Sequence, residues 1–437
     1  MPAGCGPRFA LSVGPSHHNI HNYENSRGRS VTLLVIFVVL VFAYSLISGV
    51  VERGRLTAPI IFTFAGAMSQ LLVNYEAPER FSADVFLTIA ELGLVLLLFT
   101  DGSRIVYAFR GVLLSVPGRL LSTGMLLTIV FGLLAALLLF DKITMWEAGI
   151  IAAVLAPTDA GLGQPIVSNP KVPQRIREGL NVEAGLNDGL AVPFLLFFMA
   201  MASQTDEANF SRFFVEQFGY GVLIGLFVGR VGSELFAAAI NRGWLAREYR
   251  QLGFAALPIM CMLISHETGA SMFIAAFVGG LAVRRQRPVG ISGESVKFIE
   301  DWGQLINLAV FFLFGAIVAI SWPHLHWAHF AYAAPSLTVV RMVPVAIAMA
   351  GLGFAPNTLV FMGWFGPRGL ASIVLGLVYI GHGNSTELVR MCIVATVLSS
   401  ILLHGLTARR GAEFYAAKVE KLPPDAAEKA PASLERT

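Results

Sequence analysis

Seven ionisable residues interrupt long apolar runs of the sequence, and they are the groups most able to do chemistry there. They are Glu91, Asp159, Glu183, Asp188, Arg230, Arg341 and Arg368. One such residue at the centre of a membrane span costs about 2.5–3.5 kcal/mol on insertion scales, so a chain that keeps several needs compensating contacts. Carboxylate oxygens are the ligands that hard cations prefer, and they also bind protons. The set therefore indicates a buried site that holds a small cation or a proton.

The strongest candidate in this set is Asp188, which lies in the segment 181–189. At 100° per residue, Asn181 and Asp188 share one stripe of a helix, and Glu183 lies on a neighbouring stripe. One helix can therefore direct Asp188 towards a cavity and Glu183 towards a separate partner. A buried Glu needs a cation beside it, and we predict that Arg368 forms this ion pair.

Helix breakers interrupt two of the apolar runs. Residues 156–165 contain two Pro, two Gly and Asp159, and residues 363–369 contain one Pro, three Gly and Arg368. Freed backbone groups at membrane depth are tolerated only where protein or a wet cavity satisfies them. Paired interruptions in corresponding places of two inverted halves are typical of a transporter's binding site. The negative charge of Asp159 and the positive charge of Arg368 could balance the partial charges at the ends of the facing half-helices. For Asp159, direct contact with an ion is an equal alternative.

The composition excludes most soluble classes. Of 437 residues, 55% are hydrophobic and 14% are charged, whereas an average soluble domain carries about 25% charged residues. The charges lie in short clusters between apolar runs, so the net charge of +3 gives no indication of a nucleic-acid partner. The three cysteines have neither metal-ligand nor CxxC spacing, and no cofactor is expected. We predict an all-α polytopic membrane protein surrounded by lipids.

Thirteen apolar runs have about the length that a spanning helix needs, roughly 20 residues. They cover 32–50, 57–75, 84–100, 120–140, 144–166, 179–202, 213–240, 250–265, 269–284, 302–321, 332–354, 357–380 and 387–408. The runs at 250–265 and 269–284 could instead be one interrupted segment. Together the runs define a transmembrane transport domain at 31–409, between a polar N-terminal tail at 1–30 and a short disordered tail at 410–437.

Basic residues predict the orientation of the chain. Lys and Arg concentrate in the connections that follow the odd-numbered runs. Because basic connections stay on the cytoplasmic side, this pattern places the C-terminus in the cytoplasm and the N-terminus outside. The basic residues of the N-terminal tail mildly oppose it. The short C-terminal tail argues against a large cytoplasmic regulatory domain, and the economy of the chain as a whole favours a bacterial inner (plasma) membrane.

The interrupted runs and the segment around Asp188 resemble the NhaP-type sodium/proton antiporters of the cation:proton antiporter-1 family. The resemblance extends over all thirteen runs. It implies an NhaA/NhaP-like antiporter fold with inverted repeats and two crossing interrupted helices, and it implies a homodimer. The matching motifs are Pro157-Thr158-Asp159, Glu183-x-Gly185-x-Asn187-Asp188-Gly189, Gly366-Pro367-Arg368-Gly369-x-x-Ser372 and Glu91-Leu92-Gly93.

The resemblance implies a role for each of these polar residues. Asp188 would be the main carrier of cation and proton, and Glu183 and Arg368 would form a structural ion pair. In the family, an Asn before the carrier Asp accompanies electroneutral one-for-one exchange. The bound cation would be bordered by Thr158 (through its backbone carbonyl), Asp159, Asn187 and, as in some members, Glu91.

The predicted function is secondary antiport of a monovalent cation for H⁺, not enzyme catalysis. Cation and proton would compete for Asp188 and cross by alternating access. The expected cation is Na⁺, with Li⁺ or K⁺ as alternatives, because Ala184 stands where the family commonly has an oxygen-bearing Ser. Water or Asn181 could supply that oxygen. Two other functions stay open: a gated cation channel, and an intramembrane aspartyl hydrolase using Asp159 and Asp188, although its Gly-x-Gly-Asp signature is absent.

Overall fold

Helices form all of the regular structure in the described part of the chain. The computed structural model describes residues 17–54, 56–73, 81–105, 116–203, 212–213, 215–246, 248–283, 293–381 and 385–430. Within these residues, eight helices are long and apolar enough to cross a membrane, and shorter apolar helices accompany them. The predicted all-α membrane class is therefore confirmed. The number of crossings stays a prediction, because several predicted runs correspond to short helices.

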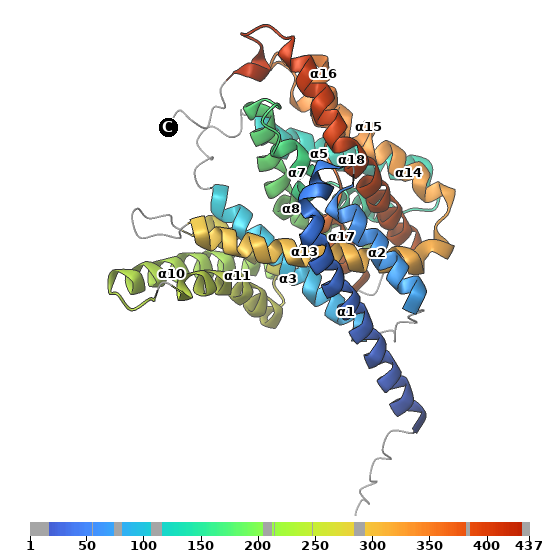
Figure 1. Ribbon diagram of the computed structural model, residues 1–437, viewed down its shortest axis with the longest axis vertical. Helices are drawn as coiled ribbons and strands as arrows, with labels where there is room; N and C mark the ends of the chain where they lie inside the picture. The colour runs from blue at the N-terminus through green and yellow to red at the C-terminus, as the bar shows by residue number, and fades with distance from the viewer. Residues whose placement is uncertain are drawn as a thin grey trace, which may run out of the picture.

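The helices are arranged in two bundles (Figure 1). In the first, the flanking bundle, α13 packs on α2 and α3, and α12 packs on α3, α10 and α11. Since α11 ends at Gly269 in the left-handed conformation and packs against α12, the runs at 250–265 and 269–284 are two helices rather than one interrupted segment. The flanking bundle comprises α1 (His17–Arg53), α2 (Ala58–Val73), α3 (Phe81–Ile105), η3 (Val215–Tyr220), α10 (Gly221–Asn241), α11 (Tyr249–Thr268), α12 (Met272–Ala282) and α13 (Gly293–Ser321).

The second bundle, the crossing bundle, contains both predicted helix interruptions. In it α6 packs on α5 and α8, α14 packs on α18, and α15 packs on α16. The short helix η4 (Trp322–His324) joins α13 to this bundle, and η5 (Ala427–Lys429) follows its last helix. The crossing bundle comprises α4 (Val116–Arg119), η2 (Leu120–Gly124), α5 (Met125–Leu139), α6 (Met145–Val154), α7 (Ala160–Val167), α8 (Gln174–Ala202), α14 (Trp327–Leu337), α15 (Val339–Ala348), α16 (Pro356–Trp364), α17 (Leu370–Gly381) and α18 (Glu387–Glu420).

Two glycines bring α2 and α13 into backbone contact. A Cβ at Gly66 would overlap the carbonyl oxygen of Phe312, and a Cβ at Gly315 would overlap that of Thr63. Helix association in lipid depends on such close packing, because the lipid tails are as apolar as the side chains and leave little hydrophobic driving force. The flanking bundle is therefore held together by contacts along whole helices.

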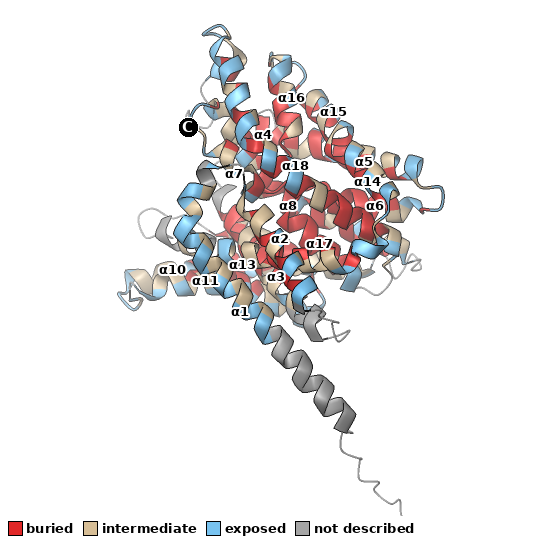
Figure 2. Ribbon diagram, turned by 45° about the vertical axis from the view of Figure 1, so that its right-hand side comes forward, coloured by how far each residue is buried: buried red, intermediate tan, exposed pale blue. Residues whose placement is uncertain are grey.

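Burial is greatest where the two bundles meet and within the crossing bundle (Figure 2). The middle of α8 is buried, including Glu183, Asn187 and Asp188. Helix α1, by contrast, leaves large apolar side chains exposed, such as Phe42 and Leu46 at 66% and 71%. A membrane helix that faces lipid exposes such residues, and one that carries polar residues buries them against protein.

A buried ion pair joins α8 to α15. Arg341 Nη1 lies 2.6 Å from Glu183 Oε1, and Nη2 donates to Oε2 at 2.7 Å. Both residues are 2% exposed, and the two parallel contacts are the bidentate geometry that strengthens such pairs. The predicted pair of Glu183 with Arg368 is therefore wrong. The reason lies in Gly366, where a Cβ would overlap Arg341 Nε: the missing side chain admits Arg341 to Glu183.

The C-terminal segment is ordered as far as residue 430, contrary to the disordered tail predicted for 410–437. Helix α18 continues to Glu420. Glu428 is 2% exposed, and its Oε1 accepts hydrogen bonds from the backbone N–H of Ala355 at 2.7 Å and from Thr358 Oγ1 at 2.8 Å. Ala355 is the N-cap of α16, where a carboxylate is favoured. Residues 431–437 lie outside the described residues.

Residues 421–430, here named the C-terminal clasp, are fixed to the ends of three helices. Arg175 Nη1, near the start of α8, donates to the carbonyl oxygen of Ala427 at 2.8 Å. Lys429 Nζ donates to the carbonyl oxygen of Glu420, the last residue of α18, at 3.5 Å. These few contacts order a polar segment whose composition alone is typical of disorder.

We predict that Glu428→Ala releases the C-terminal clasp, because Ala355 N–H and the Thr358 hydroxyl lose their acceptor. Hydrogen bonds to a charged group are worth about 1.5–3 kcal/mol each. Hydrogen exchange followed by mass spectrometry should show faster exchange in peptides covering 421–430. The matched control is Glu420→Ala, which removes an exposed carboxylate at the end of α18. Equal exchange in the two variants would contradict the assigned role of Glu428.

We also predict that Arg341→Met lowers the free energy of unfolding by about 3–5 kcal/mol, because Glu183 then stays buried without a counter-charge. Thermal unfolding in detergent measures this loss. The double variant Glu183→Leu/Arg341→Met should recover most of it, since no buried charge remains. Arg212→Ala, which breaks an exposed pair with Glu216, should change stability by no more than about 0.5 kcal/mol. A double variant no more stable than Arg341→Met would argue against the pair.

Candidate functional site

The two predicted helix interruptions are present, and they contact each other. Helix α6 ends before Leu155 and α7 begins after Asp159. Helix α16 ends before Phe365, and α17 begins at Leu370. The backbone N–H of Asp159 donates to the carbonyl oxygen of Pro367 at 2.7 Å. The two breaks therefore form one crossing, in which unpaired ends of four half-helices come together.

Asp159 satisfies the N-terminal ends of two of these half-helices. Its Oδ1 accepts a hydrogen bond from the backbone N–H of Leu162 at 2.8 Å, and its Oδ2 accepts one from that of Leu370 at 2.6 Å. Gly369 makes room for this carboxylate, because a Cβ there would overlap it. A negative charge thus lies at the positive ends of α7 and α17. Of the two predicted roles of Asp159, these contacts support the balancing of helix dipoles.

Arg368 satisfies the opposite end of the crossing. Its Nη1 donates to the carbonyl oxygens of Ala156 at 2.6 Å and Pro157 at 3.1 Å, directly after α6. Its backbone N–H donates to Ser400 Oγ of α18 at 2.6 Å. The side chain is fully buried, so its charge acts on the C-terminal end of α6 with little screening. The signs of Asp159 and Arg368 therefore match the half-helix ends as predicted.

Asp188 faces the crossing from the middle of α8 and is 4% exposed. Its Oδ1 has no hydrogen-bond partner among the described residues. Beside it, Asn187 Nδ2 donates to Thr158 Oγ1 at 2.7 Å, while Asn187 Oδ1 also lacks a partner in that part of the chain. Buried polar atoms normally have partners. Two unpartnered oxygens on adjacent residues therefore mark a place where a ligand can bind.

Asp101 of α3, which the sequence analysis did not select, joins this group from the flanking bundle. A Cβ at Gly185, about one turn before Asp188, would lie 3.2 Å from Asp101 Oδ1. The carboxylates of Asp101 and Asp159 both lie close enough to act on the charge of Asp188. The predicted run ended at residue 100, whereas α3 continues to Ile105. The misplaced boundary concealed the residue.

Glu91 lies farther along the same helix. It is about 15 Å along α3 from Asp101, at 1.5 Å per residue, and its titratable neighbour is His266 of α11. A role for Glu91 at the site stays a prediction. The acidic residue of α3 that contacts α8 next to Asp188 is Asp101.

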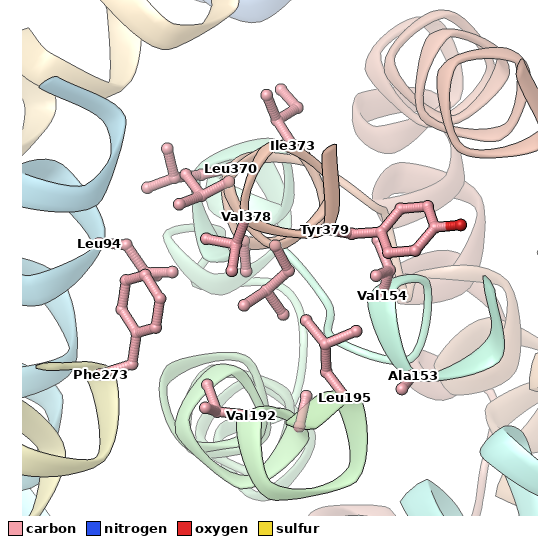
Figure 3. Close-up of a cluster of buried hydrophobic side chains, with 14 of the residues drawn as sticks. Leu94, Ala153, Val154, Val192, Leu195, Phe273, Leu370, Ile373, Val378 and Tyr379 are labelled. Atoms are coloured by element: carbon pink, nitrogen blue, oxygen red, sulfur yellow. The ribbon is translucent and has the colours of Figure 1, made fainter. Parts of the chain in front are cut away.

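The two sides of the site differ in polarity. One turn beyond Asp188, Val192 packs in a buried apolar cluster with Leu94 of α3 and Phe273 of α12 (Figure 3). In the other direction along α8, Asn181 shares the stripe of Asp188 and is exposed. A hydrated ion is excluded from an apolar cluster. The polar approach to Asp188 is therefore from the side of Asn181.

Known proteins share both sequence and fold with this chain. A family model described as "Sodium/hydrogen exchanger, transmembrane" matches residues 31–411. A K⁺/H⁺ antiporter NhaP2 of Shewanella baltica is 25% identical over 386 residues, which cover 85% of this chain and 64% of that protein. A probable Na⁺/H⁺ antiporter of Schizosaccharomyces pombe is 25% identical over 285 residues, 60% of this chain and 35% of that protein. The chain spans less than two thirds of the length of these curated relatives.

The sodium proton antiporter MjNhaP1 of Methanocaldococcus jannaschii has a similar structure. The TM-score is 0.68 at 16% sequence identity, and the match covers 90% of this chain and 99% of that one. The two chains therefore share a fold, which agrees with the predicted NhaP-like architecture. Because the family model matches most of its length, this chain belongs to the transmembrane sodium/hydrogen exchanger family.

Proposed function

We propose that this chain is a secondary antiporter that exchanges a monovalent cation for H⁺ at Asp188. The main support is the unpartnered carboxylate oxygen of Asp188 beside the helix crossing. Asp159 and Arg368 are already engaged with backbone groups, and Glu183 is paired with Arg341. Asp188 is thus the buried charge of the crossing bundle that is free to exchange its ligand. Membership of the exchanger family supports transport rather than catalysis.

Competition between cation and proton follows from the burial of Asp188. A lone carboxylate in a medium of low dielectric constant is unfavourable, so it binds either a proton or a cation. Asn187 Oδ1 adds a neutral oxygen, and the backbone carbonyl of Thr158 is proposed as another. Because both ligands use the same carboxylate, each leaves before the other binds. Alternating access then moves the loaded site between the two sides, by motion of the crossing bundle against the flanking bundle.

Na⁺ is the proposed cation, and Li⁺ and K⁺ are compared with it. Relatives of this chain are named as Na⁺/H⁺ and as K⁺/H⁺ antiporters. Ala184 offers no side-chain oxygen to a cation, so the ligand set differs from one that has Ser there. Asn187 before Asp188 supports electroneutral exchange.

We further propose thirteen crossings in two inverted halves, with the N-terminus outside and the C-terminus in the cytoplasm of a bacterium, and a homodimer as the assembly. The distribution of basic connections in the sequence supports the orientation. Several of the basic residues on which it rests lie outside the described residues, namely Arg55, Arg80, Arg110, Arg247, Arg284, Arg285 and Arg287.

Exchange is tested with purified protein in liposomes that hold a pH gradient. Addition of Na⁺, Li⁺ or K⁺ should dissipate the gradient, because the entering cation displaces protons from Asp188. Asp188→Asn should abolish the response, since a neutral amide cannot carry a proton. Asp141→Asn, which alters an exposed residue before α6, is the matched control and should exchange like the wild type. Full activity of Asp188→Asn would rule out this residue as the carrier.

Electroneutral exchange has its own signature. In the same liposomes, Na⁺-driven proton movement should leave the membrane potential unchanged, because one charge enters for each that leaves. A voltage-sensitive dye measures the potential. Charging of the vesicles by a saturable, proton-coupled flux would exclude one-for-one exchange, and charging by cation flux without proton movement would favour the channel.

A further inference from the structure

We infer that Asn307 of α13 is a cation ligand that the flanking bundle contributes to the site of Asp188. This inference rests on the proposed antiport and deepens it. It names a residue that would set ion preference, and it links cation binding to contact between the two bundles.

Asn307 lies at the helix crossing, opposite the start of α7. A Cβ built on Gly161 would lie 3.0 Å from Asp159 Oδ1 and 3.2 Å from Asn307 Nδ2. The carboxylate and the amide therefore both lie beside one small residue. Helix α13 packs on α2 and α3, so Asn307 reaches the crossing from the flanking bundle, whereas Asp159 and Gly161 belong to the crossing bundle.

The amide oxygen of Asn307 has no partner in the part of the chain that the structure describes. It is inaccessible to solvent and makes no hydrogen bond to any described residue. Like Asp188 Oδ1 and Asn187 Oδ1, it is a buried amide or carboxylate oxygen that no described residue contacts through a hydrogen bond. A buried carbonyl without a donor is costly, and a cation relieves this cost for all three oxygens at once.

A cation needs such an additional oxygen more than a proton does. Hard cations such as Ca²⁺ and Mg²⁺ take about six or more oxygen ligands, whereas a proton on Asp188 needs only the carboxylate. Ala184 supplies no oxygen, and Asn181, on the stripe of Asp188, is exposed. Loss of the Asn307 oxygen should therefore weaken cation binding and leave proton binding unchanged. A purely structural role would not separate the two.

A ligand on the flanking bundle also makes cation binding depend on the position of the crossing bundle. Asp188, Asn187 and Thr158 move together, because all belong to the crossing bundle. Asn307 does not move with them. The complete set of cation ligands therefore forms only when the two bundles bring α13 and α7 together.

The experiment compares four variants. Asn307→Ala removes the oxygen, and Asn307→Asp keeps one in a side chain of similar size. Gly161→Ala places a methyl group against the Asn307 amide, whereas Gly163→Ala, two residues later on α7, adds a methyl group with no atom within 4 Å. The two glycine variants share the same gain in helix propensity, so a difference between them reports on the contacts of residue 161 with Asn307 and Asp159, and Asn307→Ala isolates the part that belongs to Asn307.

Two measurements separate binding from transport. Thermal stabilisation of the detergent-solubilised protein by Na⁺, Li⁺ and K⁺ gives apparent dissociation constants, and its pH dependence without added cation reports proton binding. Exchange in liposomes gives the half-saturating cation concentration. Asn307→Ala should raise both cation constants about tenfold and alter the order of the three ions, with the cation-free pH dependence unchanged. Gly161→Ala should act in the same direction, Asn307→Asp should restore binding, and Gly163→Ala should resemble the wild type.

The inference is overturned if Asn307→Ala binds all three cations like the wild type, or if Gly161→Ala and Gly163→Ala behave alike. It is also overturned if the wild type binds none of the three cations. If the wild type binds cations but exchanges none, the proposed antiport fails, and the binding series alone still decides the role of Asn307.

Discussion

The structure depends on neutralising the four backbone ends that two broken helices expose deep inside the protein. Each end carries about half an elementary charge, and unsatisfied backbone groups at membrane depth cost several kcal/mol each. Asp159 lies at the N-terminal ends of α7 and α17, and Arg368 lies at the C-terminal end of α6. Without these two side chains, three of the four ends would lose the charge and the hydrogen bonds that compensate them.

The same constraint accounts for the glycines of the motif 366–369. Gly369 leaves space for the carboxylate of Asp159, and Gly366 leaves space for the guanidinium of Arg341. A second buried charge, Glu183, is thereby neutralised on a stripe of α8 that differs from the stripe of Asp188. The motif thus accommodates two charge-balancing contacts, and Asp188 is left as the buried carboxylate of α8 with an oxygen that no described residue contacts.

Much of this arrangement could be predicted from the sequence, because breakers, charges and apolar runs are local signals. Such features are the helix interruptions, the signs of the two charges at the crossing, and the helical stripe that carries Asp188. The partner of Glu183 was mispredicted, since two buried Arg residues were available and only packing at Gly366 decides between them. Asp101 was missed because the predicted run ended one residue before it. Asn307 is neutral, so a search for intramembrane charge does not detect it.

Charge balance at the crossing is also what allows the proposed exchange to use a single carboxylate. In the crossing bundle, Asp159 and Arg368 offset each other at the helix ends, and Glu183 and Arg341 offset each other in their pair. The charge that moves with the site is then set by Asp188 alone. It is zero with a proton or a monovalent cation bound, and −1 when the carboxylate is empty. In the proposed exchange, movement of the empty site would carry a net charge through an apolar interior and is therefore disfavoured, whereas both loaded forms would cross with the same net charge.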